Sequence, residues 1–247
     1  MKQRLDKLLF DRGFVRSRER AQALIIAGKV LVNEQKLEKP GASVESDSVI
    51  RLLGEDLRYV SRGGLKLEKA LDHWSIDVSG KTCVDVGAST GGFTDCLLQH
   101  GASRVIAIDT GRGQIDTKLR NDARVQLLEQ TNARYLTREQ LGLQAGANLV
   151  AMDVAFISAT LVLPAVVAAA KPREIVVLVK PQFEVGRERV GSGGIVRDEG
   201  DQAAAVAKVR EAVEQLGGTN IDVIESPITG AEGNREFLLH VVFPAKS

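Results

Sequence analysis

The sequence predicts an α/β protein in which a mostly parallel sheet, covered by helices on both faces, follows a small α+β module. Three observations indicate this fold class. From Thr82 onward, unbroken apolar runs alternate with helical patterns. A glycine-bearing turn joins the first of these runs to a helix. The segment up to Leu53 holds shorter elements with cap and turn signals of its own.

The N-terminal module is expected to contain two short helices and two strands. Gly13 and Gly28 can end the helices in left-handed caps, and Ser17 can cap the second helix at its start. The apolar positions at helical spacing are Leu5, Leu8, Leu9, Ala21, Leu24 and Ile25. The expected strands, separated by a turn at Asn33, are Val30–Val32 and Val49–Leu53. The polar stretch Gly54–Arg58 is typical of a linker, which divides the chain into residues 1–58 and 59–247.

The second part repeats strand and helix. The expected strands are Thr82–Val86, Arg104–Asp109, Val125–Glu129, Asn148–Asp153 and Glu174–Lys180. The expected helices are Gly92–Gln99, Gln114–Arg120, Thr137–Leu141, Ala159–Ala169 and Gln202–Leu216. Two late strands, Asn220–Glu225 and Glu236–Phe243, are expected to pair antiparallel at a sheet edge. Between these elements, the glycine-rich and charged stretch Glu184–Gly200 is expected to form a mobile loop.

Positive charge is concentrated at the N-terminus, although the net charge of the chain is only +1. Between residues 2 and 20, the acids Asp6, Asp11 and Glu19 face a larger set of basic residues: Lys2, Arg4, Lys7, Arg12, Arg16, Arg18 and Arg20. Such an excess suits a polyanionic partner. The alternative is a solvated helix face with spare charge.

Cysteine usage and hydropathy predict a cytoplasmic protein. Cys83 and Cys96 show no metal-ligand or disulfide spacing, which fits a reducing compartment. Met1 leads directly into a charged amphipathic pattern rather than a secretory signal. The longest apolar stretch, Leu161–Ala170, is far shorter than the roughly 20 residues of a membrane span. We therefore expect no membrane partner, and we expect no metal site because His73, His100 and His240 lack ligand spacing.

The strongest local signal is the turn that follows the strand ending at Val86. Such a turn lets a nucleotide-like ligand approach the backbone, and a Cβ at Gly87 or Gly91 would obstruct the approach. The two glycines stand four residues apart, unlike those of the dinucleotide fingerprint, and Asp85 places an acid just before the turn. S-adenosylmethionine carries a sulfonium, an ammonium and no phosphate, so this acid favours it over NAD.

Asp109, at the end of the next strand, is placed to accept hydrogen bonds from ribose hydroxyls. The predicted cofactor-binding residues of this region are Asp85, Gly87, Ser89, Thr90, Gly91, Gly92, Phe93 and Asp109. The alternative is that the glycines serve only the turn itself.

Two later strands end in charged residues. Asp153 and Lys180 stand at the carboxyl ends of neighbouring apolar runs, the edge where ligands bind in open parallel sheets. Each alone is also an ordinary way for a strand to reach water. Because two charged strand ends are expected beside the predicted cofactor turn, a functional role is favoured for both.

At this point the chain resembles the TlyA family of ribosomal RNA 2'-O-methyltransferases, named for a haemolysin, whose catalytic domain is similar to the FtsJ methyltransferase. The resemblance covers essentially the whole chain and rests on motifs at residues 59–67, 85–94, 152–154, 179–183 and 234–236. It implies a Rossmann-like, seven-stranded methyltransferase sheet. It also implies that the N-terminal module is an RNA-binding fold shared with a ribosomal protein.

The resemblance further implies the site. The family's catalytic tetrad matches Lys66, Asp153, Lys180 and Glu236, and Asn132 and Asp153 are added to the cofactor residues. The implied donor is S-adenosylmethionine. The implied substrate is cytidine ribose in 16S or 23S ribosomal RNA, as naked RNA or in ribosomal subunits. The predicted RNA-binding residues, which come from the basic excess and the position of Arg62 rather than from the resemblance, are Arg4, Lys7, Arg12, Arg16, Arg18, Arg20 and Arg62.

The chemistry of the tetrad can be argued from the residues. A ribose hydroxyl must lose its proton as it attacks, so the enzyme needs positioning and a base. Lys180 is the expected base, with Asp153 orienting it and the other two residues placing the ribose. An ordinary lysine has a pKa near 10.4, so keeping one neutral costs roughly 4 to 5 kcal/mol. Two exposed ion pairs are the alternative.

Several interpretations stay open from sequence alone. Arg62 either contacts an RNA phosphate or caps a helix, and Phe183 either stacks on a base or packs in the core. For the whole chain, the rivals are an RNA-binding protein without catalysis, a membrane-active haemolysin and a nicotinamide-dependent oxidoreductase.

Overall fold

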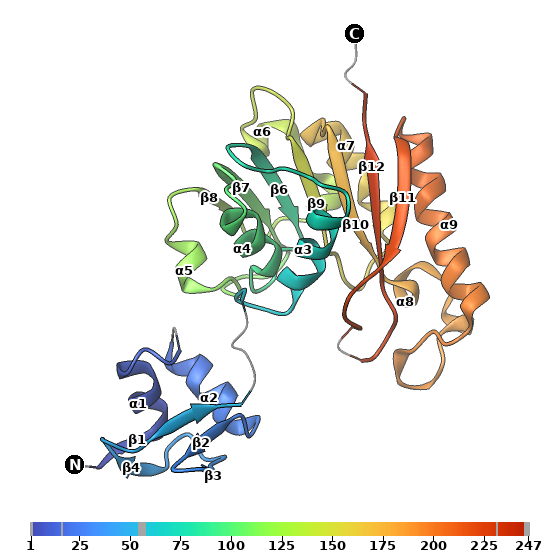
Figure 1. Ribbon diagram of the computed structural model, residues 1–247. Coiled ribbons are helices and arrows are strands. Elements are labelled where there is room, and N and C mark those ends of the chain that lie inside the picture. The colour runs from blue at the N-terminus through green and yellow to red at the C-terminus, as the bar shows by residue number, and fades with distance from the viewer. Residues whose placement is uncertain (1, 16, 54–57, 231, 245–247) are drawn as a thin grey trace. The chain divides into compact units, whose positions relative to one another are not determined.

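The chain folds into two compact units in the computed structural model, Met1–Leu57 and Arg58–Ser247 (Figure 1). The structure describes residues 2–15, 17–53, 58–230 and 232–244. The linker expected at Gly54–Arg58 therefore lies, except for Arg58, outside the described residues. In the part of the chain that the structure describes, no helix is both long and apolar enough to cross a membrane.

The small unit is an α+β module. Its helices are α1 (Leu5–Asp11) and α2 (Arg18–Ile26). Strands β1 (Lys2–Arg4) and β4 (Ser43–Glu45) form one antiparallel pair. A second sheet has the order β3-β2-β5, with β2 at Val30–Val32, β3 at Gln35–Lys36 and β5 at Ile50–Leu52. The predicted helices and the two predicted strands are confirmed, the second strand as Ile50–Leu52, whereas the polar strands β1, β3 and β4 were not predicted.

The caps of the small unit follow the sequence signals. The Ser17 hydroxyl accepts a hydrogen bond from the Arg20 amide and so begins α2. Gly13 and Gly28 have φ values of +72° and +64°, as left-handed caps require. The apolar faces of both helices then close on the sheets in one core that includes Leu5, Leu9, Ile25, Val30 and Ile50.

The large unit is built on a seven-stranded sheet of order β11-β12-β10-β9-β6-β7-β8. Its strands are β6 (Thr82–Val86), β7 (Arg104–Ile108), β8 (Val125–Leu128), β9 (Leu149–Met152), β10 (Glu174–Val179), β11 (Thr219–Glu225) and β12 (Phe237–Val242). Strands β10, β9, β6, β7 and β8 are parallel, and β12 is antiparallel to both of its neighbours. The predicted mostly parallel sheet with a late antiparallel pair is confirmed.

Helices cover both faces of this sheet (Figure 1). On one face, α3 (Gly63–His73) and α4 (Gly92–Gln99) pack on residues such as Cys83 and Val105. On the other face, residues such as Val84 and Ile106 contact a second group of helices: α6 (Arg138–Leu141), α7 (Leu163–Ala170) and α9 (Glu199–Gln215). The alternation along each strand therefore supplies two cores, as a buried parallel sheet requires.

Some predicted elements differ from the structure. The helix expected at Gln114–Arg120 is only the short α5 (Thr117–Arg120), which begins after its capping residue Asp116. The helix expected at Ala159–Ala169 is a 3₁₀ turn, η2 (Ala159–Leu161), followed by α7, because Pro164 can occupy only the first turn of a helix. Helix α3 was not among the expected helices, although a helix beginning near Arg62 was one of the two interpretations of that residue.

The stretch Glu184–Gly200 is more structured than the expected loop. It contains the end of α8 (Pro181–Glu184), two 3₁₀ turns, η3 (Arg187–Arg189) and η4 (Ser192–Gly194), and the start of α9. The buried Asn234 side chain accepts a hydrogen bond from the Val196 amide and donates one to the Gly194 carbonyl. Gln202 donates to the Val196 carbonyl. These bonds hold the segment beside the start of β12.

Candidate active site

The turn after β6 depends on two left-handed glycines. Gly87 has a φ of +89° and Gly91 has a φ of +98°. A Cβ on Gly87 would lie 2.3 Å from the carbonyl oxygen of Asp153, and a Cβ on Gly91 would lie 2.2 Å from Leu119. A side chain at either position would therefore clash with the protein itself, whereas the sequence suggested that it would obstruct a ligand. The turn must be glycine-bearing so that β6 and β9 can end side by side.

One cavity of about 360 Å³ lies beside this turn at the carboxyl ends of β6, β7 and β9. Asp109 lines it with a fixed orientation, because one carboxylate oxygen accepts from the Ser89 amide at 2.7 Å and the other from the Gly111 amide at 2.6 Å. Asn132 lines the same cavity, and its side chain caps the next turn by accepting from the Arg134 amide. Gln114 and Thr131, which were not predicted from the sequence, also line this cavity with polar side chains.

A second cavity, of about 310 Å³, lies on the other side of the turn. It is lined by all four members of the tetrad, by Arg62 and by residues of the turn: Lys66, Asp153, Lys180, Glu236, Arg62, Ser89, Thr90, Gly92 and Phe93. Gly87, Ser89 and Asp153 line both cavities. The two spaces therefore meet at the glycine turn and at Asp153.

The tetrad forms two ion pairs at the edge of the second cavity. Lys180 Nζ lies 2.5 Å from Asp153 Oδ1, and Lys66 pairs with Glu236. Lys66 and Glu236 are buried, while Asp153 and Lys180 are largely enclosed. These are not the exposed surface pairs that sequence left as the alternative.

The fold explains why residues so far apart in sequence converge. Asp153 follows β9, Lys180 follows β10, and the register that pairs Val179 with Phe237 brings Glu236 to the same end of the sheet. Lys66 comes from the first turns of α3, and its partner Glu236 lies 170 positions later.

Asp85 occupies a different place from the other predicted cofactor residues. It is fully buried at the end of β6, where Thr94 of α4 donates a hydrogen bond to its Oδ2 at 2.6 Å. Its Oδ1 has no hydrogen-bond partner among the residues that the structure describes. Burial, together with the nearby charges of Asp153 and Asp109, raises the pKa of Asp85 to about 7. Asp85 lines neither cavity, so it can influence a ligand there only through its charge and not through direct contact.

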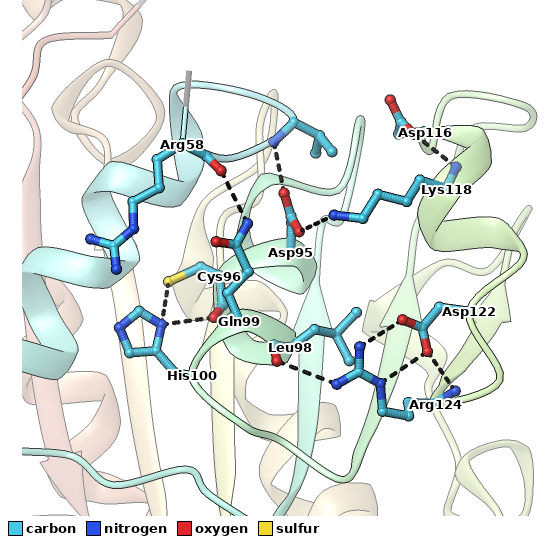
Figure 2. A network of polar contacts seen from close by, with 11 residues as sticks. Arg58, Asp95, Cys96, Leu98, Gln99, His100, Asp116, Lys118, Asp122 and Arg124 are labelled. Atoms are coloured by element: carbon cyan, nitrogen blue, oxygen red, sulfur yellow. Dashed lines mark hydrogen bonds and ion pairs between the residues drawn. The ribbon is translucent and has the colours of Figure 1, made fainter. Parts of the chain in front are cut away.

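Helix α4, which begins at this turn, is held along its outer side by polar contacts (Figure 2). The buried Asp95 accepts from the Val60 amide at 2.9 Å and lies 3.3 Å from Lys118 Nζ. Gln99 donates to the Arg58 carbonyl at 3.0 Å. These bonds fix α4 between the first residues of the large unit and α5, so the glycine turn has a rigid support.

An exposed aromatic residue stands at the rim of the first cavity. Phe156 is 92% exposed, has a φ of +63°, and lies 5.5 Å from the half-buried Phe183 between ring centroids. Its segment is anchored by the buried Glu184, which accepts from the Ser158 hydroxyl and the Ala159 amide. Burial raises the pKa of Glu184. Sequence reasoning missed Phe156, since no local pattern distinguishes it from a core residue.

The basic residues of the small unit have unequal surroundings. Arg4 and Arg18 contact Asp6, whereas Arg12 donates to the carbonyls of Ser46 and Ser48. Lys7 lies 3.6 Å from Asp11. Arg20 is half-buried, and Arg16 lies outside the described residues. In the large unit, Arg62 is exposed at the start of α3 and its side chain makes no cap bond, which leaves it open to the second cavity.

Comparisons with known proteins match both units. A model described as FtsJ-like methyltransferase matches residues 59–243, and one described as S4 domain matches residues 3–50. The chain is 45% identical to the 16S/23S rRNA (cytidine-2'-O)-methyltransferase TlyA of Mycobacterium tuberculosis, over 96% of this chain and 88% of that protein. It is 40% identical to Hemolysin A of Brachyspira hyodysenteriae, over 97% and 99% of the two chains. A solved structure from Streptococcus thermophilus superposes with a TM-score of 0.76 at 41% identity, over 99% of this chain and 90% of that one.

Proposed function

The chain belongs to the FtsJ-like methyltransferase family, and on this premise we propose that it transfers the methyl group of S-adenosylmethionine to a ribose 2'-hydroxyl of cytidine in 16S or 23S ribosomal RNA. The observation that carries the proposal is the meeting of two cavities at Asp153, one with acidic walls and the other enclosing two lysine–carboxylate pairs. The relatives named for cytidine 2'-O-methylation support the same substrate. We further propose that the protein acts in the cytoplasm, on ribosomal RNA or ribosomal subunits.

The first cavity fits a cationic nucleoside donor. Asp109 has both carboxylate oxygens held by amides, so a free lone pair on each oxygen faces a fixed direction for ribose hydroxyls. Asp85 adds an incompletely bonded carboxylate beneath the turn, and the described residues that line the first cavity include no lysine or arginine that could bind a phosphate. S-adenosylmethionine supplies a methyl carbon that is activated by a positive sulfur. We place its adenosine part against Asp109 and Asn132 and its charged part toward Asp153.

The second cavity supplies the groups that act on the ribose. The 2'-oxygen forms a bond to the methyl carbon as the carbon–sulfur bond breaks, and the hydroxyl proton passes to the free-amine form of Lys180. Asp153 orients Lys180 through their 2.5 Å contact. Lys66 and Glu236 form a pre-arranged donor and acceptor that place the sugar. Because positioning dominates such a transfer, a rigid pair contributes more than a mobile one.

Two side chains around the cavities suit the rest of the nucleotide. The exposed guanidinium of Arg62 is placed to contact the phosphate of the target nucleotide. Phe156 offers an exposed ring on which a base turned out of its helix can stack. The S4 unit, with its basic residues, would bind the phosphate backbone of the RNA.

Nucleoside mass spectrometry of ribosomal RNA tests the proposal in cells. We expect RNA from cells that lack the gene to lose one or more 2'-O-methylcytidines, and a wild-type copy to restore them. A Lys180→Ala copy should not restore them. An unchanged modification map in the deletion strain would refute the proposed reaction.

A further inference from the structure

The small unit contains a buried carboxylate in its basic region. Asp6 lies in the first turn of α1 and is completely inaccessible to solvent. Judged from the sequence alone, Asp6 would simply cancel the charge of one neighbouring basic residue. Its burial means that it must instead be matched by specific donors, because an unpaired buried charge is strongly unfavourable.

Among the described residues, four donate a total of five hydrogen bonds to the Asp6 carboxylate. Arg4 donates from Nε to Oδ1 at 3.0 Å and from Nη2 to Oδ2 at 2.9 Å. Arg18 Nη2 and Gln22 Nε2, both on α2, donate to Oδ2 at 3.1 and 2.9 Å, and the Lys7 amide donates to Oδ1 at 2.8 Å. The side-chain bonds from Arg4, with those from Gln22 and Arg18, hold the pKa of Asp6 well below its usual range. The carboxylate is therefore charged throughout the neutral range.

The two guanidiniums that Asp6 holds remain half exposed. The side chains of Arg4 and Arg18 keep 55% and 45% of their surface accessible. Each guanidinium has five N–H donors, and Asp6 uses only two from Arg4 and one from Arg18. Two positive groups against one carboxylate leave a net positive charge with N–H groups available. Such an arrangement matches phosphate oxygens, which guanidiniums bind in planar, bidentate fashion.

Arg12 and Lys7, two other basic residues of the unit, lack this arrangement. Arg12 directs its guanidinium to the Ser46 and Ser48 carbonyls, where it ties α1 to the segment before β5. Lys7 is a flexible point charge beside the exposed Asp11. Of the four residues Arg4, Lys7, Arg12 and Arg18, it is Arg4 and Arg18 that share one buried anchor.

We propose that Asp6 is a positioning residue that holds Arg4 and Arg18 together as a paired guanidinium site for the phosphate backbone of RNA. The proposal rests on the proposed function in one respect, that RNA is the ligand of the small unit. It adds that the fixed geometry of the pair, rather than the number of positive charges, gives the affinity.

Charge and positioning predict opposite results for one substitution. Asp6→Asn removes a negative charge from the basic region, so a purely electrostatic interface would bind a polyanion more tightly. If Asp6 positions the pair, the same substitution frees Arg4 and Arg18 to repel each other and binding weakens. Asp11→Asn is the matched control, because it makes the same change of charge on the same helix at an exposed position.

The experiment titrates the full-length chain with purified 23S ribosomal RNA, without methyl donor, at several salt concentrations. We expect Asp6→Asn to weaken binding roughly tenfold and to lower the slope of log affinity against log salt by about 1 to 2, as loss of one or two phosphate contacts would do. Asp11→Asn should bind at least as tightly as wild type, with an unchanged slope. A folded Asp6→Asn protein that binds as tightly as Asp11→Asn would overturn the proposal.

Arg18→Lys provides a second variant that does not remove the buried carboxylate, in case Asp6→Asn unfolds the small unit. It keeps the charge and loses the planar fork, so we expect it to weaken binding by a similar factor. Wild-type affinity in Arg18→Lys would overturn the proposal. Failure of the wild-type chain itself to bind would instead contradict the RNA-binding role of the small unit, which methyl transfer by the large unit tests separately.

Discussion

Asp6 and Asp85 are both fully buried carboxylates, one in each unit, and their surroundings differ in sign. Asp6 receives two guanidiniums, an amide side chain and a backbone amide, which hold its pKa well below the usual range. Asp85 receives one side-chain hydroxyl, keeps one oxygen unpartnered among the described residues and lies near two other acids, so its pKa is raised to about 7.

The two units therefore stabilise a buried carboxylate in different ways. In the small unit, residues of the same unit hydrogen-bond to the buried Asp6 carboxylate. The two guanidiniums carry more positive charge than Asp6 neutralises, and they remain partly exposed to solvent. The large unit leaves negative charge incompletely matched beside a cavity, where a cationic ligand can complete it. Perturbed carboxyl groups of this second kind are typical of functional sites.

The largest effect is expected at the tetrad, where charged groups again face a cavity. Lys180→Ala should lower the rate of methyl transfer by about 10² to 10⁴, the usual contribution of a general base, because the ribose proton loses its acceptor. The measurement is single-turnover transfer to ribosomal RNA at saturating donor. Lys69→Ala, an exposed lysine on the same helix as Lys66, is the control and should keep the wild-type rate. Wild-type turnover in folded Lys180→Ala would remove Lys180 from the mechanism.

The next effect concerns stability and pH. The pKa of Asp85 is about 7 in the folded chain and near the ordinary value of 3.8 when unfolded, so its folded form binds more protons between these values. Its contribution to stability is therefore fully present below about pH 4 and is lost as the pH rises through 7, by up to about 4 kcal/mol. Relative to wild type, Asp85→Asn should gain stability with rising pH.

The single tryptophan, Trp74, lies in the large unit, so denaturant unfolding followed by its fluorescence reports on this unit alone. Equal pH dependence in wild type and Asp85→Asn would contradict the account of Asp85. A cationic donor should favour the charged carboxylate, so donor binding near pH 6 should release a proton. Calorimetry in buffers of different ionisation enthalpy measures that release, which Asp85→Asn should abolish.

The smallest expected effect is on stability, when either of two exposed phenylalanines, one in each unit, is replaced by glycine. Phe10 lies in helix α1, whereas Phe156 holds a left-handed backbone conformation at the cavity rim. Phe10→Gly should destabilise the small unit by about 1 kcal/mol, because glycine is unfavourable within a helix. Phe156→Gly should stabilise the large unit by up to about 1 kcal/mol, because glycine adopts the left-handed conformation without strain. Thermal unfolding measures both.

The same Phe156→Gly variant should methylate RNA roughly tenfold more slowly, because stacking on one base contributes about 1 to 3 kcal/mol. Phe156→Trp keeps an aromatic face and should restore the rate. A Phe156→Gly protein with the wild-type rate would show that the exposed ring has no part in holding the base.

Sequence alone predicted the elements whose signals are local. The Ser17 cap, the left-handed glycines and the alternation of apolar strands with helices all depend on neighbouring residues, and the structure has them at those places. Helix α3 was missed because it begins with two glycines. Gly64 is required there, since a Cβ would lie 2.3 Å from the Tyr59 ring, a contact that no local pattern reveals.

The site was less accessible to sequence reasoning. Asp153 and Lys180 could be proposed from their positions at the ends of parallel strands, whereas Lys66 and Glu236 came only from the resemblance, because Lys66 lies on α3 and its partner Glu236 stands 170 positions later. The burial of Asp6 and the bonds of Asn234 to residues 194 and 196 likewise depend on distant segments. Local charge counts treat all such groups as exposed.

The most direct test of the account is transfer of an isotopically labelled methyl group from S-adenosylmethionine by the purified full-length chain to unmodified ribosomal subunits, followed by digestion of the RNA to nucleosides and mass spectrometry. We expect the label to appear in 2'-O-methylcytidine. Label on a nucleobase, or no label in the RNA despite bound donor, would contradict the proposed reaction.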